Sequence, residues 1–238
     1  MTKVNRKHET KHIVAILDML GASEMIKGGR SEDIMNFISN TYIDAEKNWP
    51  FTENAPKEVR KLKSITFSDN IVFALEIENM QEAEVREAVK ALTIYVSVFQ
   101  RALLKNRFLF RGGITIGKLY MDSEENFVWG DALVDAHMLE ANEAKYPRVI
   151  FSDKFDSVFL PELPRVKQDF DGKYFVDYFF KTKDSITDWI IGYDAMMETV
   201  HIKYKNNERV LEKYNWIEMH INEGMKGINL QVNEIENK

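Results

Sequence analysis

Hydrophobic and polar positions along this chain fall into two kinds of run. In some stretches, β-branched and aromatic residues follow one another or alternate over a few positions, which is typical of strands. In others, apolar residues recur every three or four positions, which is typical of amphipathic helices. In chain order these patterns predict a strand at 12–18, a helix at 31–47, strands at 62–67 and 71–75, a helix at 81–106 and a strand at 108–117.

The order of these elements predicts the fold class. A strand, a helix, two strands joined by a short polar turn, a second helix and a last strand follow the βαββαβ order of a ferredoxin-like unit. We therefore predict an α/β (α+β) fold with a ferredoxin-like βαββαβ core. In that order the first strand lies beside the second hairpin strand, so residues 12–18 and 71–75 are expected to be neighbours in one sheet.

The second half of the chain is predicted to contain short strands followed by a mainly helical region. A turn leading into a helix is expected at 128–143, short strands at 148–151 and 173–180, and helices from about 184 to 222. The expected divisions of the chain are a polar lead at 1–11, the main α/β domain at 12–183, a helical C-terminal extension packed on the same domain at 184–228, and a loose polar tail at 229–238.

Composition narrows the range of functions. The 238 residues carry a formal net charge of −6, which argues against binding to long nucleic acid because phosphate contacts need basic surface. The chain has no cysteine, so disulfides, thiolate catalysis and cysteine–zinc sites are excluded. The start of the chain lacks the apolar core of a signal peptide, and no apolar run approaches the roughly 20 residues that span a bilayer. We expect a cytoplasmic protein that does not enter membranes.

Two aspartates stand where strand-like runs end. Asp18 closes the run at 12–18, and Asp69 lies in the turn of the predicted hairpin. If those strands are neighbours, both carboxylates reach the same edge of the sheet. Carboxylate oxygens are hard ligands that suit Mg²⁺ or Mn²⁺, including ions bound to a triphosphate. Each aspartate taken alone also fits a helix cap or a turn, so their combination is what indicates metal-dependent chemistry on a nucleotide.

A glycine-rich segment partly matches the sequence pattern of a phosphate-binding loop. Residues 112–118, Gly-Gly-Ile-Thr-Ile-Gly-Lys, fit the first part of the G-x-x-x-x-G-K pattern. The next residue is Leu119 where a P-loop has Ser or Thr, so the hydroxyl that binds magnesium is missing. The residues between the glycines alternate like those of a strand. We therefore predict that this segment is a strand and binds no phosphate as a P-loop.

Around these residues the sequence resembles the class III nucleotidyl cyclases, most closely the bacterial Pycsar pyrimidine (uridylate or cytidylate) cyclases. Segment 13–23 is similar to the strand and turn that bear the first metal aspartate of that family, and segment 65–70 to the hairpin that bears the second. Segment 110–117, Phe-Arg-Gly-Gly-Ile-Thr-Ile-Gly, is similar to the family's Arg-x-Gly-Ile-x-x-Gly strand. Segment 129–140 follows the family's aromatic-Gly turn into a helix.

The resemblance implies an enzyme, a phosphorus–oxygen lyase, that converts UTP, or else CTP, to the 3′,5′-cyclic monophosphate and pyrophosphate. It implies two Mn²⁺ or Mg²⁺ ions per active site, held by Asp18, Asp69 and the backbone carbonyl of Met19. It also implies a homodimer with composite active sites, and a product read by a separate effector protein in antiphage defence. Further residues on the matching motifs are expected to bind the substrate: Gly21, Ala22, Ser23, Ile65, Arg111 and Trp129.

Three positions depart from the family pattern. The purine cyclases read the base with a lysine four residues before the second aspartate, and this chain has Ile65 there. The family's transition-state Asn and Arg fall on Val134 and Met138, which cannot stabilise phosphate. A pyrimidine cyclase is the reading we favour. A degenerate cyclase that only binds nucleotide, a purine cyclase that uses Thr66 or Lys63, and a plain interaction module remain alternatives.

Overall fold

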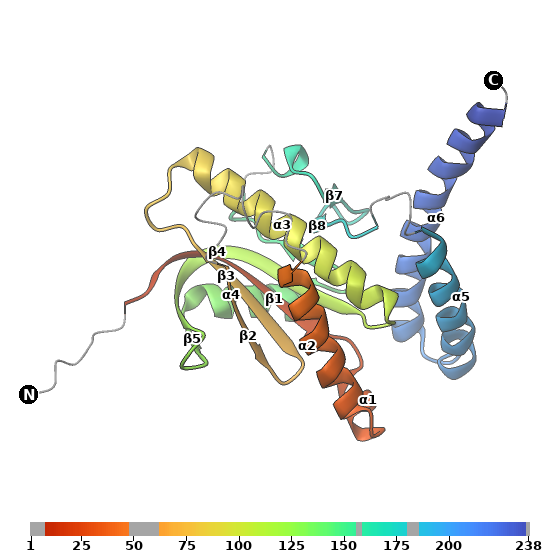
Figure 1. Ribbon diagram of the computed structural model, residues 1–238, viewed down its shortest axis with the longest axis horizontal. Helices are drawn as coiled ribbons and strands as arrows, with labels where there is room; N and C mark the ends of the chain where they lie inside the picture. Colours follow the sequence, from red (N-terminus) through yellow and green to blue (C-terminus); the bar gives the residue numbers. More distant parts are fainter. Residues whose placement is uncertain (1–7, 48–61, 156–158, 180–185, 237–238) are drawn as a thin grey trace, which may run out of the picture.

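The computed structural model describes residues 8–47, 62–155, 159–179 and 186–236 and shows helices packed on a mixed sheet (Figure 1). The strands are β1 (Thr10–Met19), β2 (Lys63–Phe67), β3 (Asn70–Glu76), β4 (Phe110–Asp122), β5 (Phe127–Trp129), β6 (Val149–Phe151), β7 (Val166–Gln168) and β8 (Tyr174–Val176). The helices are α1 (Ala22–Lys27), α2 (Ser31–Lys47), α3 (Glu82–Lys105), α4 (Asp131–Glu143), the 3₁₀ turn η2 (Leu160–Glu162), α5 (Ile186–Lys203) and α6 (Glu208–Glu236).

The sheet has the strand order β2-β3-β1-β4-β6-β8-β7, and β5 pairs with the far part of β4. β1 lies at the centre of the first four strands and is antiparallel to both β3 and β4. This is the ferredoxin-like arrangement, so the predicted fold class and the predicted pairing of the first strand with the second hairpin strand are confirmed. The register sets Asp18 opposite Asn70 on one side and Arg111 on the other.

Alternation along β1 divides the core into two layers. Ile13, Ala15 and Leu17 face the layer that contains the apolar residues of α2 and α3. Val14 and Ile16 face the opposite layer, where they meet the alanines of α4. Because Asp18 continues the second series, its side chain belongs to the α4 side of the sheet. A third cluster joins α5 and α6 to β6 and β8.

The glycines of β4 serve close packing inside the sheet. The predicted strand at 108–117 is confirmed, and β4 continues to Asp122. A Cβ at Gly113 would stand 2.7 Å from the backbone oxygen of Ala136 in α4. A Cβ at Gly117 would stand 2.9 Å from Oδ1 of Asp131. Glycine therefore lets α4 approach β4, and the P-loop-like sequence is a strand, as predicted.

The C-terminal region consists of α5 and α6, which lie side by side at one end of the sheet (Figure 1). Helices were expected from 184 to 222, and the described residues of this range are mainly helical. The last helix continues to Glu236, through most of the segment expected to be a loose tail at 229–238. No proline interrupts it, since the last proline of the chain is Pro164. The division between a domain at 12–183 and an extension remains a prediction.

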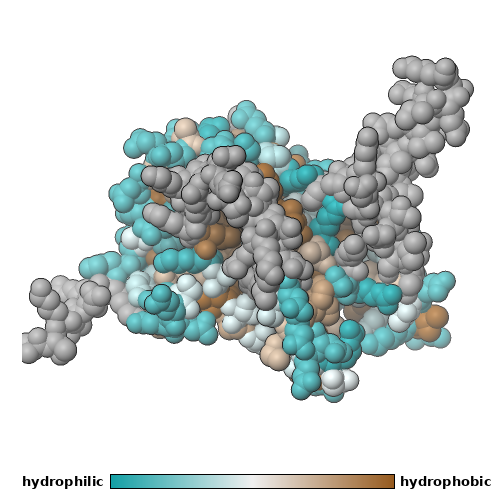
Figure 2. Space-filling model, in the orientation of Figure 1, coloured by the Kyte–Doolittle hydropathy of each residue, from teal (hydrophilic) through white to brown (hydrophobic). Residues whose placement is uncertain are grey.

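Among the described residues, no helix is both long enough and apolar enough to cross a membrane. On the face shown in Figure 2, most coloured residues are hydrophilic, and apolar ones occur in scattered patches.

Candidate active site

The site is built where β1 and the β2–β3 turn meet. Asp18 is the second-last residue of β1. Asp69 lies in the turn between β2 and β3, after Ser68, whose φ of 53° is left-handed and reverses the chain sharply. The backbone N–H of Met19 donates a 3.1 Å hydrogen bond to the carbonyl oxygen of Asp69. The two aspartates therefore come from adjoining backbone segments at one edge of the sheet, as the sequence predicts.

Arg111 links Asp18 to α4. Its Nε lies 3.4 Å from Oδ2 of Asp18, its partner across β1 and β4. One terminal nitrogen lies 2.6 Å from Oε1 of Glu140, and the other donates a 3.5 Å hydrogen bond to the carbonyl oxygen of Ala144. The guanidinium thus bridges two carboxylates, which it can do because its donors form a planar fork.

Glu140 is a site residue that sequence reasoning missed. Its side chain is 3% exposed and reaches Arg111 from the inner face of α4. His137, one turn earlier, has Nδ1 3.5 Å from the other oxygen of Glu140. A signal was present in the sequence: Glu140 follows Ala132 and Ala136 at four-residue spacing, so an acidic residue falls on the face that packs on the sheet.

Negative charge outweighs positive charge in this cluster. Burial raises the pKa of the Asp18 carboxyl, Arg111 acts against that rise, and the charge of Asp69 adds to it. Burial likewise raises the pKa of Glu140, opposed by Arg111 and reinforced by Asp18 and Asp69. The carboxylates of Asp18 and Glu140, which disfavour each other's ionisation, lie with Asp69 around one guanidinium and form a site that a bound cation would stabilise.

The donor set fits a hard divalent cation. Asp18, Asp69 and the carbonyl of Met19 offer oxygen atoms only, which is the preference of Mg²⁺ and Mn²⁺. Among the described residues no group of three or more His, Cys, Asp or Glu side chains is gathered as a metal cage. A site of two carboxylates leaves room for phosphate oxygens and water around the ion, which is how Mg²⁺ is commonly held with a nucleotide.

The turn after β1 contains three of the expected substrate-binding residues. Gly21 has a φ of 78° and occupies the N-cap position of α1, a conformation that glycine adopts without strain. Ala22 is buried in the core beneath the sheet end. Ser23 is exposed. The structure therefore places Gly21 and Ser23 near the end of β1, while the side chain of Ala22 packs inward.

Ile65 and Trp129, the other expected substrate-binding residues, are not gathered around Asp18. Ile65 is 5% exposed and packs with apolar residues of β1 and β3 on the α4 side of the sheet. Trp129 is 67% exposed on β5. It pairs with Tyr120, toward the opposite end of β4 from Arg111. Within one chain, Trp129 is therefore far along the sheet from the aspartates.

A pocket of about 590 Å³ adjoins the aspartate turn. It lies between α2 and β2, on the other side of the sheet edge from Arg111. Asp69 and Met19 form one side of it, and the rest of its lining alternates hydroxyl groups with apolar side chains, among them Ser31, Ile34, Ser64 and Thr66. It offers hydrogen-bonding groups and apolar surface beside the carboxylate of Asp69.

The exposed side of α4 is apolar at the two positions that depart from the cyclase pattern. Val134 is 60% exposed and Met138 is 53% exposed. They are four residues apart, so they share one face of the helix, opposite to the face that carries Glu140. Neither residue takes part in the Arg111 cluster.

Comparisons with known proteins identify the fold. The guanylyl cyclase domain of the RhoGC fusion protein from the aquatic fungus Blastocladiella emersonii matches with a TM-score of 0.50 and 12% identity, over 72% of this chain and 96% of that one. The chain therefore has the fold of a guanylyl cyclase domain. A dimeric form of the fungal domain scores 0.48 at 14% identity over 72% and 98% of the two chains.

A guanylyl cyclase domain from Catenaria anguillulae, in complex with GTP, scores 0.45 at 14% identity over 72% of this chain and 97% of that one. No protein-family model and no curated protein sequence matches the chain. At these identities the likeness concerns the fold, and the chemistry has to be argued from the residues of this chain.

Proposed function

We propose that this chain is a metal-dependent nucleotidyl cyclase that converts a pyrimidine nucleoside triphosphate, UTP first and CTP second, to its 3′,5′-cyclic monophosphate and pyrophosphate. The observation that carries the proposal is the meeting of Asp18, Asp69 and Arg111 at one sheet edge of a guanylyl cyclase fold. No protein nucleophile is required, because the ribose 3′-oxygen attacks the α-phosphorus as the bond to pyrophosphate breaks and the 3′ proton is lost.

The carboxylates would hold two Mg²⁺ or Mn²⁺ ions, with Asp18, Asp69 and the Met19 carbonyl as the protein ligands. When bound, such ions lower the pKa of the 3′-hydroxyl and neutralise charge on the phosphates. Asp18 and Asp69 keep the reacting end of the nucleotide at the sheet edge. Arg111 donates charge-assisted hydrogen bonds to the triphosphate, and Glu140 holds the guanidinium in place through its 2.6 Å ion pair.

The choice of a pyrimidine rests on Ile65. An isoleucine cannot donate the hydrogen bond that a lysine at this position gives to a purine, and it packs into the core at 5% exposure. The similar fungal domain is a guanylyl cyclase, so GTP belongs among the substrates to be tested. The use of the product as a second messenger in antiphage defence, read by a separate effector, rests on the resemblance alone.

One observation favours a second candidate function. Val134 and Met138 are apolar and exposed where the cyclase pattern has groups that stabilise the transition state. A nucleotide-binding regulator that holds a triphosphate without turning it over would need no such groups. The intact pair of aspartates with Arg111 supports catalysis over this alternative.

The test is incubation of the purified protein with ATP, GTP, CTP or UTP and Mn²⁺, with the products identified by mass spectrometry. A cyclic pyrimidine monophosphate is the expected product. A cyclic purine product would retain the reaction and overturn the base assignment. Binding of a triphosphate with no cyclic product from any of the four would replace the enzyme with the regulator.

A further inference from the structure

Helix α6 packs one face against the sheet. Nearer the start of the helix, the same face carries basic residues on the side of the candidate active site. Trp216 and His220 are buried, and Nε1 of Trp216 donates a 2.7 Å hydrogen bond to Oδ2 of Asp169. Lys213 precedes Trp216 by three residues and Arg209 precedes Lys213 by four, so all four share one helix face. This face is aromatic and buried at Trp216. One turn earlier it carries a positive charge at Lys213, whose side chain is half-buried.

Two contacts hold this part of α6 beside the segments that carry the site. Nζ of Lys145 lies 3.1 Å from Oε2 of Glu212, the residue before Lys213. Lys145 directly follows Ala144, whose carbonyl accepts a hydrogen bond from Arg111. On the other side, Leu20, which follows Asp18 and Met19, packs against the cluster that contains Trp216 and Ile217. The start of α6 therefore lies beside the segment that follows α4, and α6 shares an apolar cluster with the residue that follows β1.

The charges of the site act on Lys213. Burial lowers the pKa of its ammonium, the charges of Arg111 and Arg209 lower it further, and Asp18 and Glu140 act in the opposite direction. The structure gives the Lys213 ammonium no ion pair within the described ranges of the chain. A half-buried ammonium is costly without an anionic partner, and the cations around it make that position suitable for an added anion.

We propose that Lys213 is a binding residue for the phosphates of the triphosphate, supplied to the site by a helix outside the ferredoxin-like core. This inference rests on the proposed function, because it names a further group of the same site. Lys213 and Arg111 together form the positive side of a site whose negative side is Asp18 and Asp69. In the cyclisation, both cations offset the charge that develops on the departing pyrophosphate.

Binding of inorganic tripolyphosphate with Mg²⁺, measured by isothermal titration calorimetry, tests the inference without requiring turnover. Lys213→Met keeps the aliphatic length and removes the charge, and it should weaken the Kd by about tenfold or more, as the loss of a charge-assisted contact does. Lys213→Arg keeps the charge and should bind close to the wild type. Lys205→Met is the matched control, since it removes one positive charge from an exposed lysine just before α6 and leaves Lys213 and its docking contacts in place.

The outcomes separate this inference from the proposed function. Equal Kd values for Lys213→Met and the wild type would overturn the inference, as would an equal loss in Lys205→Met or no binding of tripolyphosphate by the wild type. Binding that depends on Lys213 in a protein that makes no cyclic nucleotide would support the inference and refute the cyclase. Cyclisation with an unchanged Kd in Lys213→Met would support the cyclase and refute the inference.

Discussion

Arg111 is the residue through which the strands and the helix of the candidate site are joined. Its guanidinium contacts Asp18 on β1, Glu140 on α4 and the carbonyl of Ala144 beyond the helix end. Both carboxyl partners have a raised pKa, for which burial is the main cause. The arginine therefore reduces the cost of burying two negative charges, and under the proposed function it also offers a cation to the triphosphate.

Replacement of Arg111 should weaken ligand binding, and it should also lower stability because it leaves the buried Glu140 without its cation. Arg111→Ala is expected to weaken nucleoside triphosphate binding by about tenfold or more, since contacts to charged groups contribute about 1.5–3 kcal/mol. Isothermal titration calorimetry with Mg²⁺ and UTP measures this. Arg86→Ala, which removes an exposed arginine from α3, controls for the change in net charge. An unchanged affinity for UTP would contradict the role given to Arg111.

The close packing of α4 on β4 requires a glycine at position 113. Gly113→Ala would bring a Cβ to 2.7 Å from the backbone oxygen of Ala136, so α4 must move away from β4. We expect the free energy of unfolding to fall by about 1–3 kcal/mol, the usual effect of overpacking a core. Chemical denaturation measures the change. A variant as stable as the wild type would show that α4 does not need this close approach.

At the level of single residues, the sequence predicted the site residues that lie at the ends of strands. The approach of Asp18 to Asp69 followed from the predicted order of strands, and Arg111 was expected in the site through the resemblance to the cyclase strand. The observed register sets Asp18 opposite Arg111. Glu140 was missed because its partner Arg111 lies on a distant strand, and only the three-dimensional packing of α4 brings them together. The burial of Ile65 was likewise outside the reach of a local pattern.

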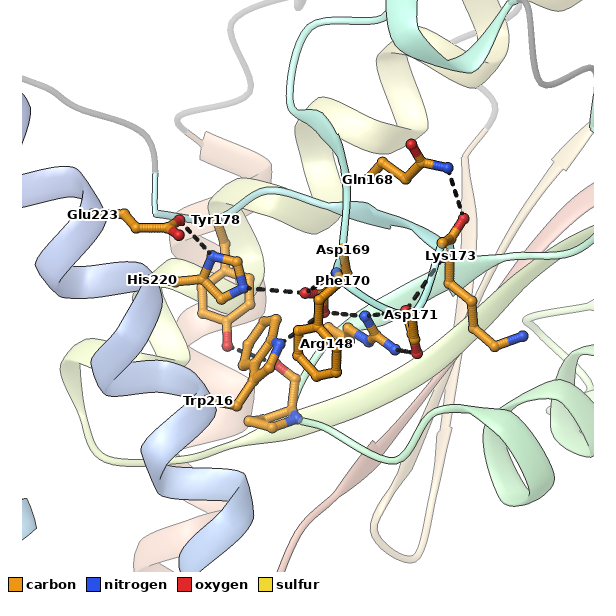
Figure 3. A network of polar contacts seen from close by, with 12 residues as sticks. Arg148, Gln168, Asp169, Phe170, Asp171, Lys173, Tyr178, Trp216, His220 and Glu223 are labelled. Atoms are coloured by element: carbon orange, nitrogen blue, oxygen red, sulfur yellow. Dashed lines mark hydrogen bonds and ion pairs between the residues drawn. The ribbon is translucent and has the colours of Figure 1, made fainter.

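Among the elements, α6 is held to the sheet by a buried ion-pair network (Figure 3). Arg148, at the start of β6, is fully buried and pairs with Asp169 and Asp171 of the β7–β8 turn. Trp216 donates to Asp169, and Nε2 of His220 lies 3.7 Å from the same carboxylate. One aspartate thus connects a strand to the helix that carries Lys213.

The pKa of Asp169 predicts how stability depends on pH. Burial acts to raise that pKa, but contacts from His220, the Phe170 N–H, Trp216 and Arg148 together lower it below its ordinary value. A carboxyl with a lowered pKa stabilises the fold above its unfolded pKa of about 3.9. That stabilisation is lost as the pH falls through the lower folded pKa.

Asp169→Asn should therefore reduce the free energy of unfolding by about 3 kcal/mol near pH 7, because it leaves the buried Arg148 with one carboxylate. The difference from the wild type should shrink as the pH falls below about 4. Denaturation at a series of pH values measures both. Asp171→Asn, at the more exposed partner, should cost less. A difference that stays constant down to acid pH would contradict the assigned role of Asp169.

The elements of the first half were predictable because their periodicity is strong. Repeats of two and 3.6 residues identified β1, β3, β4 and α3 and excluded a P-loop, since the residues between the glycines alternate as strand residues do. The polar composition of residues 229–238 predicts a loose tail, whereas α6 continues to Glu236. Polar helices lack the apolar stripe that makes a helix visible in a sequence.

For the whole molecule, the proposed function implies a dimer, because Trp129 and the exposed face of α4 lie away from the aspartates of their own chain. Val134, Met138 and Trp129 are large, apolar and exposed by more than half. Val134 and Met138 share one face of α4, and adjoining exposed apolar residues are typical of a surface that a partner covers. A second copy of the chain would bring these groups to the site of the first.

Met138→Glu tests this assembly, since a carboxylate buried in an interface without a partner is costly. We expect the wild type to sediment as a dimer, and the variant to sediment as a monomer that has lost most of its cyclisation activity. Ile202→Glu, at an exposed position on α5, is the matched control and should remain dimeric and active. An active monomer would rule out composite active sites.

The measurement that bears most directly on the central claim is the rate of cyclic nucleotide formation by the wild type, Asp18→Asn and Asp69→Asn. Both substitutions keep the size of the side chain and remove a negative charge that is proposed to bind metal. We predict that each lowers the rate by about a thousandfold or more, a loss of about 4 kcal/mol of transition-state stabilisation, while thermal unfolding shows both variants folded. Cyclisation at the wild-type rate by either folded variant would contradict the assignment of the two aspartates as the centre of the active site.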